Sequence, residues 1–279
     1  MIWLLAACLL SFGFGQLWKW SQHRGLSAPA VVSTNYLVMA TVLMLYFLWR
    51  DTLSFSPPIL LVGGTIGLSF IVSMLFMTRA LERANVGIVL TSFRLSILIP
   101  IAYGIWVWDE TATALQLLGI ALALVSLVLM TGGQTAGGAP TDRASLPLIL
   151  TVFALQGICH CCLRWVHYAD LDPQRLHVLC ITALTAGLSG ALFLFASGRK
   201  PTSRDLTMGL GIGLFNLVAL GTTLTALSLF QGTLFFPLNG SAVVILDNVF
   251  AHYIWREALS RQSLYGVALG VVAMLLIFQ

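Results

Sequence analysis

A succession of long apolar segments constrains this chain more than any other feature of its sequence. A membrane-spanning helix needs about 20 mainly apolar residues, and ten segments have roughly that length. They cover residues 2–20, 29–49, 58–77, 86–108, 114–131, 146–168, 176–197, 206–230, 234–255 and 263–278. Only 9% of the residues are charged, against about 25% in a typical soluble domain. We therefore predict an all-α integral membrane protein with ten transmembrane helices.

One stretch with the composition of a linker divides these segments into two sets of five. Residues 133–145 are rich in Gly and polar residues and contain Pro140, so they cannot form a spanning helix. We expect a first five-helix repeat at 1–132, a linker at 133–145 and a second five-helix repeat at 146–279. Because each half crosses an odd number of times, the second repeat is predicted to be inverted relative to the first. Many secondary transporters are built in this way, with the substrate near the membrane midplane.

A sequence pattern near the end of each half supports the repeat. In the first half it consists of Ala80-Leu81, Trp108, Glu110 and Gly119. In the second half it consists of Ala226-Leu227, Trp255, Glu257 and Gly266. The first pair of residues is displaced by 146 positions and the other three by 147.

This pattern and the five-plus-five layout resemble the drug/metabolite transporter superfamily, EamA type. In that family a Glu follows the fourth span of each repeat and precedes a span that opens with Gly. The resemblance implies a secondary active carrier, often an exporter of amino acids or other metabolites, in the inner membrane of a bacterium. The two halves differ at one aligned position, where Pro100 in the first half corresponds to Asp247 in the second.

The basic residues bear on partners and orientation. They are scattered singly despite a net charge of +4, so no nucleic-acid patch is expected. Of those near the predicted connections, only Arg50, Arg164 and Arg175 lie at even-numbered ones. The positive-inside rule would then place both termini outside the cytoplasm, whereas the family resemblance implies cytoplasmic termini.

Two ionisable residues stand out inside predicted spans, where a charge costs about 2.5–3.5 kcal/mol on insertion scales. Arg94 lies about 12 Å along its span from the third connection, and Asp247 lies about 12 Å from the ninth. Both connections are odd-numbered and therefore on one membrane face. The two residues are expected at equal depth, so we predict that they pair.

Two interpretations of this pair stay open. It can be a static ion pair that joins the two halves, since partnering is how buried charges are normally accommodated. Alternatively, Arg94 binds a substrate carboxylate, because a guanidinium suits a carboxylate geometrically, and Asp247 responds to protons or cations.

Further candidate substrate-binding residues are Asn239, Gln156 and His160. Asn239 follows Pro237, whose ring frees a backbone carbonyl in its span. Gln156 and His160 are four residues apart and share one helix face. The run Cys159-His160-Cys161-Cys162 points in four directions on a helix, so we expect no metal site. The five cysteines lie in apolar segments, which argues against a disulfide framework.

These observations favour a secondary transporter whose substrates are small metabolites such as amino acids. The alternatives are an efflux carrier for hydrophobic compounds and an intramembrane lipid-modifying enzyme, although no cluster of acid–base residues supports an enzyme. No cofactor is expected, and no phosphate-binding Gly-x4-Gly-Lys-Ser/Thr loop is present. The expected partners are a small-molecule substrate and the lipid bilayer, and a monomer would be sufficient.

Overall fold

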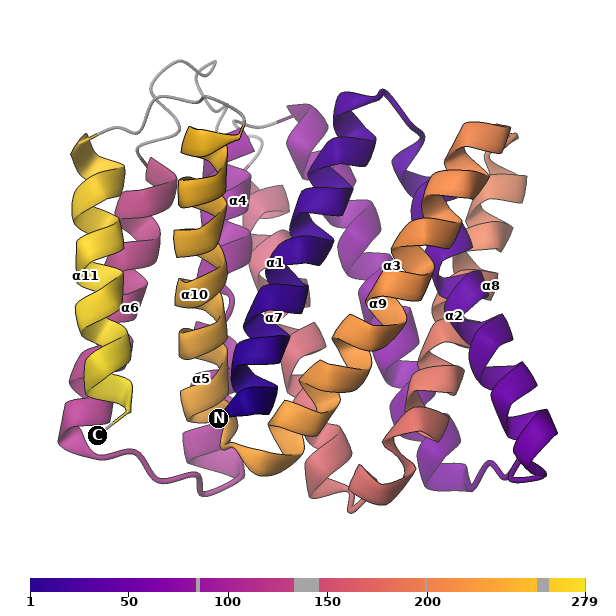
Figure 1. The fold of residues 1–279 in the computed structure, drawn as a ribbon, viewed down its shortest axis with the longest axis horizontal. Helices are drawn as coiled ribbons and strands as arrows, with labels where there is room; N and C mark the ends of the chain where they lie inside the picture. The colour runs from indigo at the N-terminus through magenta and orange to yellow at the C-terminus, as the bar shows by residue number, and fades with distance from the viewer. Residues whose placement is uncertain (84–85, 133–145, 199, 255–260, 279) are drawn as a thin grey trace. The chain divides into compact units, whose positions relative to one another are not determined.

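The protein is helical throughout the part of the chain that the computed structural model describes, residues 1–83, 86–132, 146–198, 200–254 and 261–278. Figure 1 shows the helices in chain order. They are α1 (Ile2–His23), α2 (Ala28–Arg50), α3 (Pro57–Arg83), α4 (Val86–Leu95), α5 (Leu98–Val107), α6 (Ala114–Gly132), α7 (Leu146–Tyr168), the 3₁₀ turn η2 (Asp172–Gln174), α8 (Arg175–Ala196), α9 (Ser203–Leu229), α10 (Gly232–Tyr253) and α11 (Arg261–Ile277).

Seven of the described helices are long and apolar enough to cross a membrane: α1, α2, α3, α7, α8, α9 and α10. Their length and composition are compatible with a multi-pass membrane protein, because a helix satisfies all its backbone hydrogen bonds internally. The remaining predicted spans, 86–108, 114–131 and 263–278, correspond to shorter apolar stretches at Ser92–Val107, Ala114–Leu129 and Leu264–Ile277.

The expectation of one continuous helix over residues 86–108 is wrong. The chain forms two ten-residue helices, α4 and α5, separated by a turn at Ser96 and Ile97. Pro100 has no backbone N–H to donate to the Ser96 carbonyl, and its ring crowds that carbonyl. The Ile99 N–H donates to it instead, at 3.1 Å, which tightens the backbone into a turn.

The described helices form two compact units, each of which contains segments from both halves of the sequence. Unit 1 consists of Met1–Leu75 and Cys162–Ser228, and unit 2 consists of Phe76–Cys161 and Leu229–Gln279. Helices α3 and α7 therefore contribute to both units. The predicted division into halves at 1–132 and 146–279 stays a prediction, and the linker 133–145, Trp255 and Glu257 lie outside the described residues.

Glycines bring the helices of unit 1 together. Helices α2 and α8 lie side by side (Figure 1). A Cβ atom at Gly63 of α3 would lie only 2.8 Å from the Val178 carbonyl oxygen of α8, and one at Gly67 would lie 2.6 Å from the carbonyl oxygen of Thr182. Glycine is therefore required at both positions, because any side chain would separate the two helices.

The same kind of contact occurs between α9 and α2. A Cβ atom at Gly209 would lie 3.0 Å from the Val31 carbonyl oxygen, and one at Gly213 would lie 2.7 Å from the carbonyl oxygen of Asn35. Glycines of α3 thus approach α8, and glycines of α9 approach α2.

Unit 2 is organised around the pair of α6 and α11, which also lie side by side (Figure 1). Gly119 of α6 would place a Cβ atom 3.0 Å from the Ala273 carbonyl oxygen of α11. In the same interface, the buried Ser126 hydroxyl donates a hydrogen bond of 2.7 Å to the Gly266 carbonyl. Helix α10 packs against α5, α6 and α11, so it holds a central position in this unit.

Candidate functional site

Arg94 and Asp247 form the predicted ion pair in unit 2. The Arg94 Nη2 atom lies 2.6 Å from the Asp247 Oδ2 atom, so the guanidinium donates a short, charge-assisted hydrogen bond. The side chains are 27% and 22% exposed, respectively. Both charged side chains are therefore mostly, but not fully, buried.

Two local features place Arg94 beside α10. Helix α4 ends at Leu95, one residue after Arg94, and the Ser96 hydroxyl closes the turn by donating to the Phe93 carbonyl at 2.6 Å. The next residue, Ile97, faces α10 at Gly240, where an added Cβ atom would lie 3.5 Å from its Cδ1 atom. The break in the helix thus lies against α10 next to the ion pair.

Gln156 and His160 form a second polar group in unit 2. The Gln156 Nε2 and His160 Nε2 atoms are 3.3 Å apart, as expected for two residues on one face of α7. The His160 ring also lies against Phe236 of α10, with ring centroids 5.1 Å apart. This group therefore meets α10 about 16 Å along the helix from Asp247, which is eleven residues further on.

Asn239 lies between these two groups on α10. Its Oδ1 atom is buried and accepts no hydrogen bond from any residue that the structure describes. A buried amide oxygen without a donor costs about 1–3 kcal/mol, so it is a position at which a ligand donor would be stabilised. The structure thus distributes the five predicted residues along α10, as one ion pair, one Gln–His group and a separate amide.

No group of three or more His, Cys, Asp or Glu side chains within the described residues is arranged to hold a metal ion. The cysteines are all free thiols, and three of them follow one another closely on α7 at positions 159, 161 and 162. Cys159 and Cys162 share one face of the helix, because they are three residues apart, and Cys161 points away from that face.

Glu110, which the sequence marked only as part of the repeated pattern, caps a helix. Its carboxylate accepts hydrogen bonds from the backbone N–H groups of Gly232 and Thr233, at 3.0 and 2.7 Å. These two groups belong to the first turn of α10 and have no partner inside that helix. A carboxylate at a helix N-terminus is also favoured by the helix dipole. Glu110 therefore anchors the helix that carries Asp247.

Sequence reasoning missed two polar contacts inside unit 1. The Asn216 Nδ2 atom donates to the Asn35 Oδ1 atom at 3.2 Å, and the two residues are 3% and 1% exposed. Arg164, which was expected at a connection, is buried, donates to the Leu227 carbonyl and lies 5.0 Å from the Tyr168 ring centroid. An Asn in the middle of a long apolar segment was the available signal for the first contact.

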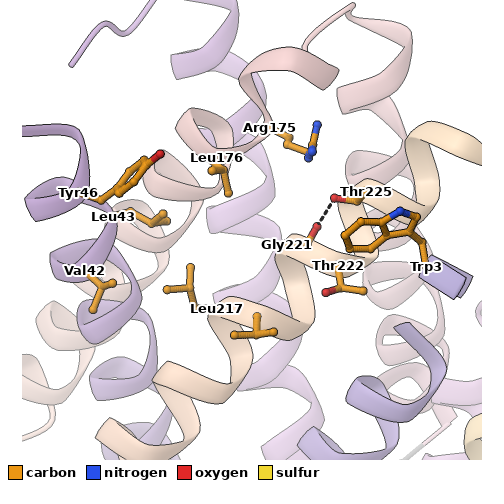
Figure 2. A pocket seen from close by; sticks show the side chains of 11 residues that line it. Trp3, Val42, Leu43, Tyr46, Arg175, Leu176, Leu217, Gly221, Thr222 and Thr225 are labelled. Carbon is orange, nitrogen blue, oxygen red and sulfur yellow. Dashed lines mark hydrogen bonds between the residues drawn. The ribbon is translucent and has the colours of Figure 1, made fainter. Parts of the chain in front are cut away.

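A groove of about 370 Å³ lies on unit 1, and none of the five predicted residues lines it. We call it the unit 1 groove, and Figure 2 shows its lining. The lining residues are Trp3, Val42, Leu43, Tyr46, Arg175, Leu176, Leu217, Val218, Gly221, Thr222 and Thr225. They come from α1, α2, α8 and α9, and Arg175 supplies the charge.

Comparison with known proteins identifies relatives of the whole chain. No protein-family model matches it. An uncharacterized protein of Haemophilus influenzae is 22% identical over 289 residues, which cover 99% of this chain and 97% of that protein. A solved crystal structure of a protein with 17% sequence identity is similar with a TM-score of 0.81, over 99% of this chain and 94% of the other. At this identity, the structural similarity concerns the fold alone.

Proposed function

We propose that the chain is a secondary active transporter of EamA type that exports small metabolites such as amino acids. In this proposal it crosses the cell membrane of a bacterium ten times, as two inverted five-helix repeats. The residues proposed to contact the substrate are Arg94, Asp247, Asn239, Gln156 and His160.

The Arg94–Asp247 contact is the observation that carries the proposal. Asp247 lies within Gly232–Phe250, a stretch that is apolar enough to span a membrane, and Arg94 lies within the apolar stretch Ser92–Val107. Charges at such positions are expensive and mark functional sites by default. Both side chains keep more than a fifth of their surface exposed, and in this proposal that part of Arg94 receives the substrate carboxylate.

Competition for the guanidinium provides a physical means of coupling. A substrate carboxylate that binds Arg94 displaces Asp247, and the displaced carboxylate then favours binding of a proton or cation, since its positive partner is gone. Substrate and coupling ion would thus bind to the two members of one pair.

The close approaches of helices in unit 1 support the inverted repeat. Gly63 and Gly209, which are 146 residues apart, approach Val178 and Val31, which are 147 residues apart. The first-half glycine contacts a second-half helix, and the second-half glycine contacts the equivalent first-half helix. Such reciprocal contacts are expected when two similar segments are related by a two-fold axis.

Counterflow of radiolabelled amino acids in proteoliposomes tests the proposal. The native chain would be compared with Arg94→Gln, Asp247→Asn and the double variant that carries both changes, with and without a pH gradient. Arg24→Gln is a matched control, because Arg24 is exposed and lies over the Trp20 ring, 4.0 Å from its centroid. We expect exchange by the native chain and the control, and loss of exchange in all three variants.

The double variant separates the two interpretations of the pair. It leaves no unpaired charge, so it should be at least as stable to heat as either single variant. If it also regained exchange, the pair would be only structural and the proposed site would be refuted. Absence of exchange by the folded native chain with any metabolite pool would refute the metabolite substrate and favour a carrier of hydrophobic compounds.

A further inference from the structure

We propose that the unit 1 groove binds an anionic phospholipid, with an acyl chain along its apolar wall and the phosphate against Arg175. The groove shares no residue with the proposed transport site, and the two sets of residues belong to different units. Three properties of the groove support this occupant: its open apolar wall, the unused donors of its arginine and the distribution of basic residues around it.

Part of the apolar wall of the groove is exposed, whereas Leu43 in the same wall is buried. Val218 is 56% exposed and Trp3 is 45% exposed, although both line the hollow. Gly221 contributes no side chain, and an added Cβ atom there would meet no atom within 4 Å. An open apolar groove on helices that can span a membrane fits a lipid acyl chain. The volume of the unit 1 groove, about 370 Å³, is at the lower end of the range for ligand sites.

Arg175 lies at the polar end of the groove with donors to spare. It is the first residue of α8, where the helix dipole also favours an anion. Its Nη1 atom donates to the Asp172 carbonyl at 2.9 Å, which is the single hydrogen bond that it makes with the described residues. A guanidinium has five N–H donors, so the others are available to phosphate oxygens.

A second arginine lies near the same end. The Arg50 guanidinium lies 6.0 Å from the ring centroid of Tyr46, which lines the groove. Three carboxylates are close in sequence, and Asp170 is one of them, at an exposed position. Asp51 follows Arg50 at the exposed end of α2, and the Asp172 carboxylate contacts His167 Nδ1 at 2.5 Å, so Asp172 already has a partner.

Two of the three basic residues at the even-numbered connections lie near the groove. There are three of them in the sequence, Arg50, Arg164 and Arg175. Arg164 is buried inside the protein, with its guanidinium on the Leu227 carbonyl. The other two are the arginines near the groove, and such basic pockets at helix ends are typical of sites for anionic lipid headgroups.

Native mass spectrometry of the purified full chain tests this proposal. The probes are palmitoyl-oleoyl-phosphatidylglycerol and the zwitterionic phosphatidylcholine with the same chains, titrated into detergent-solubilised protein. We expect phosphatidylglycerol to bind the native chain at least fivefold more tightly than phosphatidylcholine. Arg175→Gln should weaken phosphatidylglycerol binding about fivefold, the factor that follows from losing one basic group near an anionic headgroup.

A second variant tests the apolar part of the unit 1 groove without removing a charge. Gly221→Leu places a side chain in open space and favours the helix, because Leu has the higher helix propensity, so it should fold. We expect it to reduce binding of both lipids. Its matched control is Gly211→Leu, on the same helix, where an added Cβ atom also meets nothing within 4 Å, and Arg24→Gln is the control for the charge.

Three results would overturn the proposal. They are equal binding of the two lipids by the native chain, unchanged phosphatidylglycerol binding in both Arg175→Gln and Gly221→Leu, and an equal loss in the control variants. If Gly221→Leu abolished amino-acid counterflow and left lipid binding unchanged, the groove would belong to a substrate pathway instead.

Discussion

Replacing Glu110 removes the carboxylate that caps the first turn of α10. Glu110 is 5% exposed and accepts hydrogen bonds from two backbone N–H groups, those of Gly232 and Thr233. A hydrogen bond to a charged group contributes about 1.5–3 kcal/mol, and part of the total is offset because a carboxylate no longer has to be desolvated. We expect Glu110→Ala to lower the free energy of unfolding by about 3 kcal/mol. Glu110→Gln keeps one acceptor oxygen and should lose about half as much.

The assay is thermal unfolding of the protein in detergent, followed by fluorescence-detected size exclusion. For a chain of this size each kcal/mol lowers the Tm by about 2–4 °C, so Glu110→Ala should lower it by about 6–12 °C. The control is Asp109→Asn, which removes one negative charge from the neighbouring, exposed position. A Tm for Glu110→Ala within 2 °C of that for Asp109→Asn would refute the capping role.

Two further perturbations test the helix contacts in each unit. Asn216→Ala should lower stability by about 1 kcal/mol, the upper part of the range for hydrogen bonds between membrane helices. The double variant Asn35→Ala/Asn216→Ala should lose less stability than the two single variants lose together, as measured by Tm in a double-mutant cycle. Additive losses would contradict the amide pair. Gly119→Val should lower the Tm by at least 4 °C, because its side chain would separate α6 from α11. The same change at Gly64, where an added Cβ atom meets nothing within 4 Å, should leave the Tm nearly unchanged.

The sequence anticipated the ion pair because depth can be counted along a helix. Arg94 and Asp247 were each placed about 12 Å from one face, and the structure brings their side chains to 2.6 Å. Their role in binding a substrate stays a prediction. The sequence also contained the reason for the break between α4 and α5, Pro100, but a proline inside a helix does not always cause a break. Pro237 lies within α10, which continues past it.

Other contacts between side chains could not be predicted from their depth along a helix, because they depend on which helices become neighbours. Asn35 and Asn216 are 181 residues apart, and no periodicity indicates that their side chains meet. Arg164 was assigned to a connection because it lies near the end of an apolar segment. Its guanidinium is instead buried against a carbonyl of another helix.

The sequence by itself determined the helical class and the approximate positions of the apolar helices. It could do so because in lipid each backbone polar group must be satisfied within its own helix, which makes length and hydropathy sufficient. Only the tertiary structure decided which side chains share an interface, as with Glu110 and the start of α10 or Arg175 and the unit 1 groove. Those contacts depend on helix rotation and on close approach at glycines, which result from packing between segments distant in the sequence.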